Sequence, residues 1–511
     1  MGHLAIWGAP GTGKTYTLTG HYLQKPEARK LVVSFRNETA DNIRATLTDL
    51  TGIEVQKDTV NTIHGACYRL LGSKGYADVM QPADYTKFQQ ETGYALTPPV
   101  RDGLTPSKSK GLVDCYGWLH NTKRPVKDMV KFPGWDKIKL SRKRSEEALK
   151  AYDQWKREHG KLDFTDMLTE VLKQRLIPDC DILMVDEFQD LTALQYDIFK
   201  MWAGKIKNVV IAGDPLQSIY SFWGGSPDYF QHFQAEHVIL ERSHRLPRQI
   251  WEYAVKVAGR DKMEAPKIEA GEHKGTITHQ NHTKYLKDTG TWQGTTDNTV
   301  FHLVRSNYQA PAIAHEMARN GILWDGISGW TEQETAVLNV LIRAKQSDNR
   351  LIISKYEMLA LLEQFPLNVF AHGGTKKSIR ADIKKEQRED YGPLFGGESL
   401  YKILESPDPV SHMSHKGELK RAKFQNALKR YSKPVKWQDV QATTLTTIHG
   451  SKGLEADKVF LHTGITKNIK KGMRRDRAEE ARVFYVGITR AKKDLVIVKD
   501  KGDNFPLPGV R

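Results

Sequence analysis

The chain has 511 residues, of which 39% are hydrophobic and 27% charged, and this length predicts about three or four structural units at roughly 150 residues each. The composition excludes wholesale disorder, and the absence of an apolar run near ~18 residues argues against a membrane span or a signal segment. The net charge of +16, from 77 Lys and Arg against 61 Asp and Glu, favours a polyanionic partner such as nucleic acid. Three scattered cysteines, Cys67, Cys115 and Cys180, suggest neither a disulfide framework nor a zinc site, so we expect a cytosolic protein.

Short apolar runs alternate with amphipathic segments along the chain. The amphipathic segments 40–50 and 194–202 have helical spacing, and the alternation predicts α/β units with parallel sheets. The runs predicted to be buried parallel strands are 4–7, 31–35, 182–186, 208–214, 237–240, 298–304, 442–448, 458–464 and 494–498.

Most of the positive charge is concentrated in two stretches. Residues 101–160 contain 15 Lys and Arg against 8 Asp and Glu, and residues 366–440 contain 15 against 9. The shorter segment 467–477, KNIKKGMRRDR, has a net charge of +5. A charged segment can be a solvated face, but concentration into two insertions favours surfaces that follow phosphates.

The segment GAPGTGKT at residues 8–15 follows the first predicted strand and precedes a predicted helix. This is the context of a phosphate-binding loop, in which glycines allow backbone N–H groups to point at phosphate oxygens. Lys14 is expected to reach the β- and γ-phosphates, and the Thr15 hydroxyl to coordinate Mg²⁺. The residues predicted to bind the nucleotide here are Gly8, Ala9, Pro10, Gly11, Thr12, Gly13, Lys14, Thr15 and Tyr16.

The segment ILMVDEFQD at residues 182–190 places an acidic pair at the end of a predicted strand. Asp186 can hold the Mg²⁺, and Glu187 can accept a proton from the attacking water. An acidic pair at a strand end is often a surface turn, but together with a phosphate-binding loop it predicts hydrolysis of a nucleoside triphosphate. We therefore expect ATP and Mg²⁺ as cofactors.

Further motifs show what the hydrolysis drives. Together with the two segments above, they resemble, in the same order along the chain, the UvrD/Rep-like branch of superfamily 1 DNA helicases. The matching segments are SFRNETA (34–40), VNTIHGACYRLL (60–71), LDFTDML (162–168), VDEFQD (185–190), GDPLQSIYSFWG (213–224), LERSHRLP (240–247), LVRSNYQAPAIAHEM (303–317), TTIHGSKGLE (446–455) and VFYVGITRAKKDL (483–495).

The resemblance implies an α/β fold with two RecA-like P-loop cores, each interrupted by a largely helical basic insertion. The insertions match the family only by position. The implied first core is 1–66 with 161–238, its insertion is 67–160, the second core is 239–346 with 438–511, and the short second insertion is 347–437.

The resemblance also assigns roles at the nucleotide. Gln217 would sense the γ-phosphate, and Arg245 and Arg490, from the second core, would act as two arginine fingers. His244 would lie beside the base, and Glu455 would contact the ribose.

A single-strand track needs aromatic faces on which bases can stack. The run YSFW lies beside glycines, which makes it poorly placed for packing and well placed for a groove. The residues at or beside the matching DNA-binding positions are Phe35, Asn37, His64, Tyr220, Phe222, Trp223 and His449.

The chain departs from the family pattern in several places. Only seven residues precede Gly8, where the family usually has a segment that reads adenine, and His244 replaces a stacking tyrosine. We therefore expect GTP to support hydrolysis within about tenfold of ATP. Phe222 and Trp223 stand where tryptophan and arginine are usual, and the short second insertion argues against strong processive unwinding.

The resulting hypothesis is an ATP-dependent helicase or translocase that moves 3′ to 5′ on single-stranded DNA. The alternatives are a translocase that remodels protein–DNA complexes or recombination intermediates with little unaided unwinding, and an ATP-switched regulator that binds nucleic acid. Its expected partners are single-stranded DNA, tailed duplex DNA and a loading or accessory protein, with no membrane. We expect it in the cytoplasm, with RNA left open as a second track.

Overall fold

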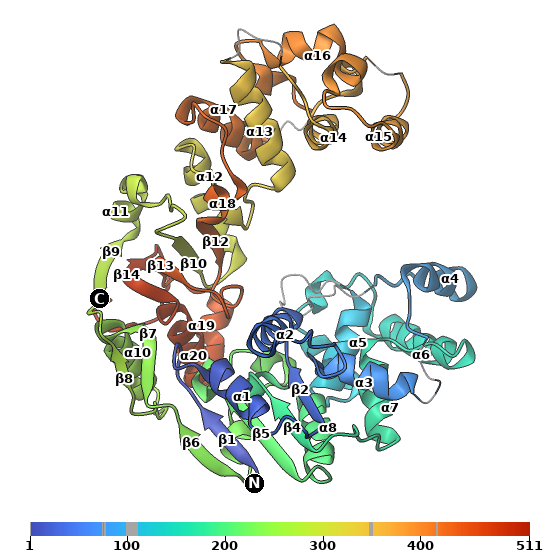
Figure 1. Cartoon of the computed structure of the whole chain (residues 1–511), viewed down its shortest axis with the longest axis vertical. Helices are drawn as coiled ribbons and strands as arrows, with labels where there is room; N and C mark the ends of the chain where they lie inside the picture. Colours follow the sequence, from blue (N-terminus) through green and yellow to red (C-terminus); the bar gives the residue numbers. More distant parts are fainter. Residues whose placement is uncertain are drawn as a thin grey trace. The chain divides into compact units, whose positions relative to one another are not determined.

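The computed structural model describes residues 2–73, 75, 78–98, 111–346, 351–371, 373–414 and 417–510 (Figure 1). Residues 101–110, 372 and 415–416, which belong to the two basic stretches, lie outside the described residues. Packing divides the chain into two compact units, Met1–Lys274 with Arg475–Thr489 and Gly275–Arg474 with Arg490–Arg511. Within the described residues, no helix combines the length and apolar character needed to cross a bilayer.

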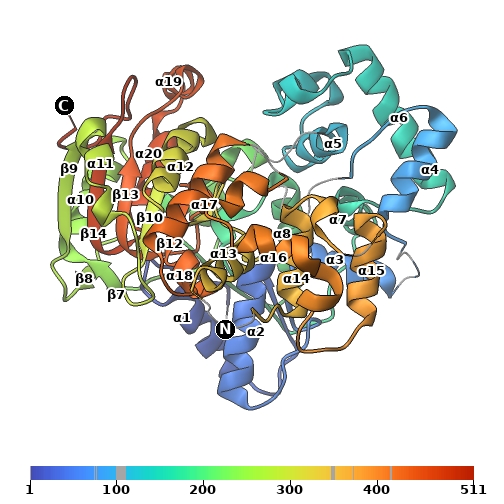
Figure 2. The same cartoon turned by 90° about the horizontal axis from the view of Figure 1, so that it is seen from above.

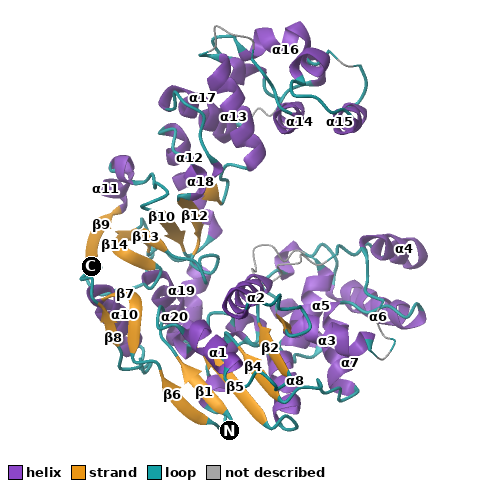
Figure 3. Ribbon diagram, in the orientation of Figure 1, coloured by secondary structure: helices purple, strands orange, loops and turns teal. Residues whose placement is uncertain are grey.

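A six-stranded sheet forms the centre of the first unit, with every neighbouring pair parallel (Figure 3). The strand order is β3-β2-β4-β5-β1-β6. The strands are β1 (Leu4–Trp7), β2 (Lys30–Ser34), β3 (Val60–Thr62), β4 (Ile182–Val185), β5 (Asn208–Gly213) and β6 (Glu236–Ile239).

Helices cover both faces of this sheet, because successive strand residues point to opposite sides. Leu183 and Val185 pack with α3, α7 and α8, whereas Met184 packs with α1 and α2. The helices are α1 (Lys14–Leu23), α2 (Asn37–Thr51), α3 (Ile63–Gly72), α7 (Phe164–Lys173), α8 (Ala193–Ala203) and the short α9 (Asp228–Gln231).

The first insertion is helical and has its own core. Its helices are α4 (Pro82–Thr92), α5 (Leu112–Asn121) and α6 (Arg142–Glu158), with 3₁₀ turns at Val126–Lys131 and Trp135–Lys137. Phe88, Trp118 and Tyr152 pack in this core. The buried Lys156 ammonium lies 2.8 Å from the Asp163 carboxylate and 2.6 Å from that of Asp166, which ties α6 to α7.

The chain after β6 also packs in the first unit. It forms β7 (Arg242–Pro247), α10 (Arg248–Arg260) and β8 (Glu269–Gly271); β7 pairs with β8, and α10 packs against α20 (Arg477–Ile488). Sequence motifs placed these residues in the second core, whereas packing places residues 240–274 and 475–489 in the first unit. The motor-domain boundaries drawn from the motifs stay a prediction.

A second six-stranded parallel sheet forms the centre of the second unit. Its order is β11-β12-β10-β13-β14-β9. The strands are β9 (Thr276–Asn281), β10 (Val300–Val304), β11 (Asp325–Gly326), β12 (Thr443–Thr447), β13 (Ala456–His462) and β14 (Ala491–Lys499). The helices beside it are α11 (His282–Lys287), α12 (Ala310–Arg319), α18 (Trp437–Gln441) and α19 (Lys467–Met473).

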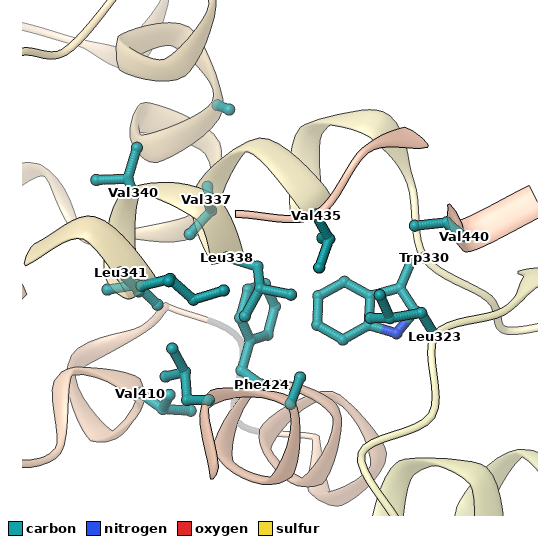
Figure 4. Close-up of a cluster of buried hydrophobic side chains, with 14 of the residues drawn as sticks. Leu323, Trp330, Val337, Leu338, Val340, Leu341, Val410, Phe424, Val435 and Val440 are labelled. Carbon is teal, nitrogen blue, oxygen red and sulfur yellow. The ribbon is translucent and has the colours of Figure 1, made fainter. Parts of the chain in front are cut away.

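Among the described residues, the second insertion contains the helices α14, α15, α16 and α17, which pack with α13, just before the insertion, on a continuous apolar core. Trp330, Leu338 and Phe424 lie at the centre of the cluster in Figure 4. The buried Lys423 ammonium lies 2.9 Å from the Glu334 carboxylate and 4.9 Å from the centre of the Trp330 ring, which joins α17 to α13. The helices are α13 (Glu332–Ala344), α14 (Lys355–Gln364), α15 (Lys376–Lys385), α16 (Gly397–Leu404) and α17 (Glu418–Arg430).

The predicted fold class is confirmed, with two parallel sheets and helical insertions. All nine predicted strands form, but the expectation that 237–240 is a buried strand is wrong. Val238 and Ile239 are exposed because β6 is the edge of the sheet, paired only with β1.

Candidate nucleotide site and nucleic-acid contacts

The phosphate-binding loop joins β1 to α1, and hydrogen bonds to its backbone groups hold its shape. Gly11 and Gly13 have φ values of 76° and 81°, in the left-handed region that glycine adopts without strain. The Gly8 N–H donates to the Gly213 carbonyl at 3.1 Å, which ties the loop to β5. The Lys14 ammonium donates to the Gly8 carbonyl at 2.8 Å, and this holds the lysine across a loop whose N–H groups precede a helix.

Asp186 lies at the carboxyl end of β4, next to this loop. Its Oδ2 accepts a hydrogen bond from the Thr15 hydroxyl at 3.1 Å. The carboxyl is fully buried, and burial together with the neighbouring Glu187 charge raises its pKa to about 6. The Lys14 charge acts in the opposite direction on this pKa. A hydroxyl and a carboxylate are hard oxygen ligands, so Thr15 and Asp186 fit Mg²⁺ completed by nucleotide phosphates.

Glu187 is held in position by a glutamine to which the sequence analysis gave no role. Gln189 donates from Nε2 to the Glu187 carboxylate, and its Oε1 accepts the Asp214 N–H at 3.0 Å. Glu187 itself has a φ of 52°, an uncommon conformation for a residue other than glycine. Gln189 lies two residues after Glu187 in the segment VDEFQD, and this closeness to Glu187 is the sequence signal that could have identified it as a site residue.

Gln217 lies on the next strand end and bonds to a buried carboxylate. Its Nε2 donates to Asp214 at 2.8 Å, and Trp7 Nε1 donates to the same carboxylate at 3.3 Å. The Tyr485 hydroxyl, from α20, is 3.4 Å from Asp214, and burial raises the pKa of this carboxyl. The sequence analysis missed Asp214 and Tyr485, although both stand in quoted motifs.

Strand β7 lies against the phosphate-binding loop. Ser243 Oγ donates to the Pro10 carbonyl and the His244 N–H donates to the Gly11 carbonyl, each at 2.9 Å. A Cβ at Gly11 would lie 2.7 Å from the Arg245 Cβ, so only glycine fits there. The structure therefore brings Arg245 next to the loop within the first unit, while the His244 side chain is exposed.

Arg490 and Glu455 lie close together in the second unit. Arg490 is buried and donates from Nη1 to the carbonyl of Leu454, the residue before Glu455, at 3.2 Å. The Ala456 N–H donates to the Arg490 carbonyl at 3.1 Å, where β13 and β14 begin. Their contacts with a nucleotide stay predictions.

The aromatic residues predicted to contact DNA divide into two groups. The Phe35 and Tyr220 rings have centroids 5.8 Å apart, and Phe222 lies 6.0 Å from Tyr220. Trp223 instead packs in the core of the first insertion, and Trp118 Nε1 donates to the Phe222 carbonyl at 2.6 Å. The expectation that the run YSFW is poorly placed for packing is therefore wrong for Tyr220 and Trp223, which are buried.

The polar candidates are spread over both units. Asn37 is exposed at the start of α2. His64 is half-buried with its ring 6.4 Å from that of Phe164, and burial lowers its pKa to about 4, so it is neutral at pH 7. His449 is buried in the second unit, just after β12.

The fold and this site define a P-loop nucleoside triphosphatase with two parallel α/β cores. The chain matches the UvrD/REP helicase N-terminal domain family over residues 1–238 and the UvrD-like helicase C-terminal domain family over residues 345–502. The chain therefore belongs to the UvrD/Rep helicase family, a class of ATP-hydrolysing enzymes.

Similar proteins cover nearly the whole chain. The ATP-dependent DNA helicase UvrD2 of Mycobacterium bovis is 27% identical, over 97% of this chain and 76% of that protein. DNA helicase II of Haemophilus influenzae is 24% identical, over 97% and 81%. The ATP-dependent DNA helicase PcrA of Leuconostoc citreum is 23% identical, over 97% and 80%.

Proposed function

We propose that this protein is an ATP-dependent DNA helicase that moves 3′ to 5′ along single-stranded DNA. One observation carries the proposal: Lys14, Asp186 and Gln217 follow the neighbouring strands β1, β4 and β5 at one edge of the sheet. Each is held there by a hydrogen bond, Lys14 with the Gly8 carbonyl, Asp186 with the Thr15 hydroxyl and Gln217 with the Asp214 carboxylate. This arrangement supports ATP hydrolysis. The family membership and the names of the relatives support DNA as the substrate on which the enzyme acts. The 3′ to 5′ direction comes from the resemblance of the motifs.

The residues of the first sheet would each perform part of the hydrolysis. Lys14 exchanges its bond to the Gly8 carbonyl for phosphate oxygens, and Glu187, oriented by Gln189, accepts the proton of the attacking water. Thr15 and Asp186 would hold Mg²⁺, which when bound neutralises phosphate charge. Gln217, fixed by Asp214, reports the γ-phosphate to the chain that follows β5.

Two arginines would complete the site. Arg245 lies on β7 beside the loop, and Arg490 lies in the second unit with Glu455, the proposed ribose contact. Guanidinium groups stabilise charge on the transferring phosphoryl group and can contribute ~10³–10⁵ in rate. Because Arg490 belongs to a different unit from Lys14, hydrolysis would depend on the relative position of the units, which couples chemistry to movement.

The DNA would lie on the half-buried Phe222 ring, with Asn37, His64 and His449 as polar contacts. Phe35 and Tyr220, which are buried, would support that ring. A neutral His64 suits a hydrogen bond to a base or sugar better than an ion pair with phosphate. Stacking on aromatic rings contributes ~1–3 kcal/mol per base without reading sequence, as translocation requires. The bacterial DNA helicases among the relatives support a cytoplasmic location.

Unwinding of tailed duplexes tests the proposal. Duplexes with a 3′ tail, a 5′ tail or blunt ends are incubated with enzyme, ATP and Mg²⁺, with Glu187→Gln enzyme as the matched control. We expect strand separation for the 3′-tailed duplex alone. Separation of the 5′-tailed duplex alone would contradict the direction. ATP-dependent displacement of a protein from a 3′ tail without separation would favour the translocase alternative.

A further inference from the structure

Arg36 is a half-buried arginine beside the nucleotide site that the proposed hydrolysis does not use. It lies between β2 and α2, and its carbonyl accepts a hydrogen bond from the Ala40 N–H of that helix at 3.1 Å. The helix α2 packs beside α1, which begins at Lys14 (Figure 1 and Figure 2). Both helices follow parallel strands of the first sheet, so Arg36 and Lys14 lie at the same carboxyl edge.

The guanidinium of Arg36 is held by Tyr220, which belongs to the segment after β5. Its Nη2 donates to the Tyr220 hydroxyl, and its central carbon lies 5.5 Å from the centre of the Tyr220 ring. Tyr220 is buried and packs against Phe35, the residue before Arg36, so the hydroxyl has a fixed position. A planar group that donates to a phenol and lies over its ring is restricted in orientation as well as in place.

The strand pairing places Arg36 beside the segment that contains Glu187. Val33 of β2 lies opposite Val185 of β4, and the Asp186 N–H donates to the Val33 carbonyl at 2.9 Å. Neighbouring strands are ~4.8 Å apart, so the residues that follow these two strands start next to each other. The long side chain of Arg36 can therefore act on the turn after β4.

Three carboxylates act on the charge of Arg36. Burial lowers the pKa of this guanidinium, but neighbouring groups raise it by more: the Tyr220 hydroxyl, Asp190, Glu38 and Glu187. Two of these acids belong to one turn, since the Asp190 N–H donates to the Glu187 carbonyl at 2.9 Å. A cation in a partly desolvated place attracts carboxylates more strongly than one in water, so Arg36 stabilises this turn.

We propose that Arg36 is a positioning residue that holds Glu187 in the conformation in which it accepts the proton of the attacking water. Glu187 needs support because its φ of 52° is costly for a residue with a side chain and persists only where the surroundings fix it. Gln189 supplies one support, and the charge of Arg36, anchored on Tyr220, supplies a second. A phosphate of the bound strand is a less suitable partner, because three carboxylates already counterbalance this guanidinium. The inference rests on the proposed function, which gives Glu187 its task.

Steady-state ATP turnover at saturating oligothymidine tests this inference. Arg36→Gln keeps a donor for Tyr220 but removes the charge, and it should lower kcat by roughly 10- to 100-fold while the KM for ATP stays near wild type, because a misplaced base loses rate and not binding. Arg36→Lys restores the charge and should recover most of the turnover. Tyr220→Phe, which removes the anchoring hydroxyl with little change of shape, should lower kcat by roughly 2- to 10-fold. In Glu187→Gln enzyme, the added Arg36→Gln substitution should lower turnover by less than about twofold, because Arg36 acts through Glu187.

Arg44→Gln is the matched control. Arg44 is a half-buried arginine of the same helix that pairs with Asp41 and donates to the Val60 carbonyl at 3.0 Å, so its variant should keep the wild-type kcat. The inference is overturned if Arg36→Gln behaves like this control, or if its loss is undiminished in Glu187→Gln enzyme. It is also overturned if Arg36→Gln weakens oligothymidine binding at unchanged kcat, the result expected for a guanidinium that binds a DNA phosphate.

Two further outcomes separate folding and the proposed function from this inference. If Arg36→Gln loses nucleotide binding because it does not fold, the isosteric Tyr220→Phe enzyme decides, and wild-type kcat in that variant overturns the inference. Failure of the proposed function shows separately, as Glu187→Gln enzyme that turns over ATP like wild type.

Discussion

Both sheets have six parallel strands, but the chemistry at their carboxyl edges differs. At the first edge the carboxylates of Asp186 and Asp214 are buried and hydrogen-bonded to their neighbours. At the second edge Tyr308 and Lys467 are exposed. Parallel strands bring their following loops to one edge whatever the loop sequences are. The loop residues that follow the strands then set the burial and the charge at each edge.

The largest effect is expected at the two arginines proposed to complete the nucleotide site. Arg490→Ala, and separately Arg245→Ala, should lower turnover of ATP with single-stranded DNA by ~10³–10⁵-fold while leaving strand affinity nearly intact. Steady-state ATPase and anisotropy assays measure the two quantities. An equal loss of DNA affinity would show that the arginines bind the DNA strand and not the nucleotide, which would contradict the comparison of the two edges.

Removing the proposed base should separate chemistry from binding. Glu187→Gln should lower turnover by ~10²–10⁴-fold but still bind ATP, because the residue touches the attacking water and not the phosphates. Lys14→Ala should instead lose nucleotide binding, since it removes the ammonium that reaches the phosphates. Equilibrium binding of a fluorescent nucleotide distinguishes the two variants. Turnover by Glu187→Gln near the wild-type rate would show that another group accepts the proton of the attacking water.

Substitutions of two adjacent aromatic residues should have different effects, one on protein stability and the other on DNA binding. Trp223→Ala should lower the free energy of unfolding by about 3–5 kcal/mol, because the ring is buried in the core of the first insertion. Phe222→Ala, at a half-buried ring, should chiefly weaken single-strand binding. Denaturant unfolding and anisotropy on both variants test this. A Trp223→Ala protein that is as stable as wild type but binds DNA more weakly would show that Trp223 contacts DNA.

The buried Asp186 carboxyl should make the nucleotide-free protein sensitive to pH. The pKa of Asp186 is raised from 3.8 to about 6 in the folded protein, so the folded state binds this proton more tightly than the unfolded state. Stability from this group is full below pH ~4 and falls by roughly 3 kcal/mol as pH rises through 6. Asp186→Asn should therefore gain stability relative to wild type between pH 4.5 and 7 in urea unfolding. If the stability difference between Asp186→Asn and wild type does not change with pH, the pKa of the Asp186 carboxyl is not raised.

Much of this architecture was predictable because buried parallel strands are continuous apolar runs, such as 182–185 and 208–213. Short strands without such runs were not predicted: β3, β7, β8, β9 and β11. β9, for example, reads TITHQN and is held by pairing with β14. Tertiary pairing, which no local pattern encodes, decides these elements.

The candidate site was predictable where a motif fixes local geometry, as in the phosphate-binding loop and the acidic pair. It was not predictable where a side chain acts through another: Gln189 connects Glu187 to the Asp214 backbone, a contact across 25 residues. The burial of Trp223 depends on α5 and α6 of the insertion, which lie far away in sequence. Such roles follow from packing partners rather than from spacing.

The most direct test of the coupling between the two edges is ATP turnover by the wild-type enzyme with and without single-stranded DNA. Turnover is measured at saturating ATP and Mg²⁺ with rising concentrations of oligothymidine, with Glu187→Gln enzyme as the background. The account predicts slow turnover alone and a saturable rise of at least tenfold with DNA. Turnover that is the same at every DNA concentration, while the DNA is shown to be bound, would contradict it.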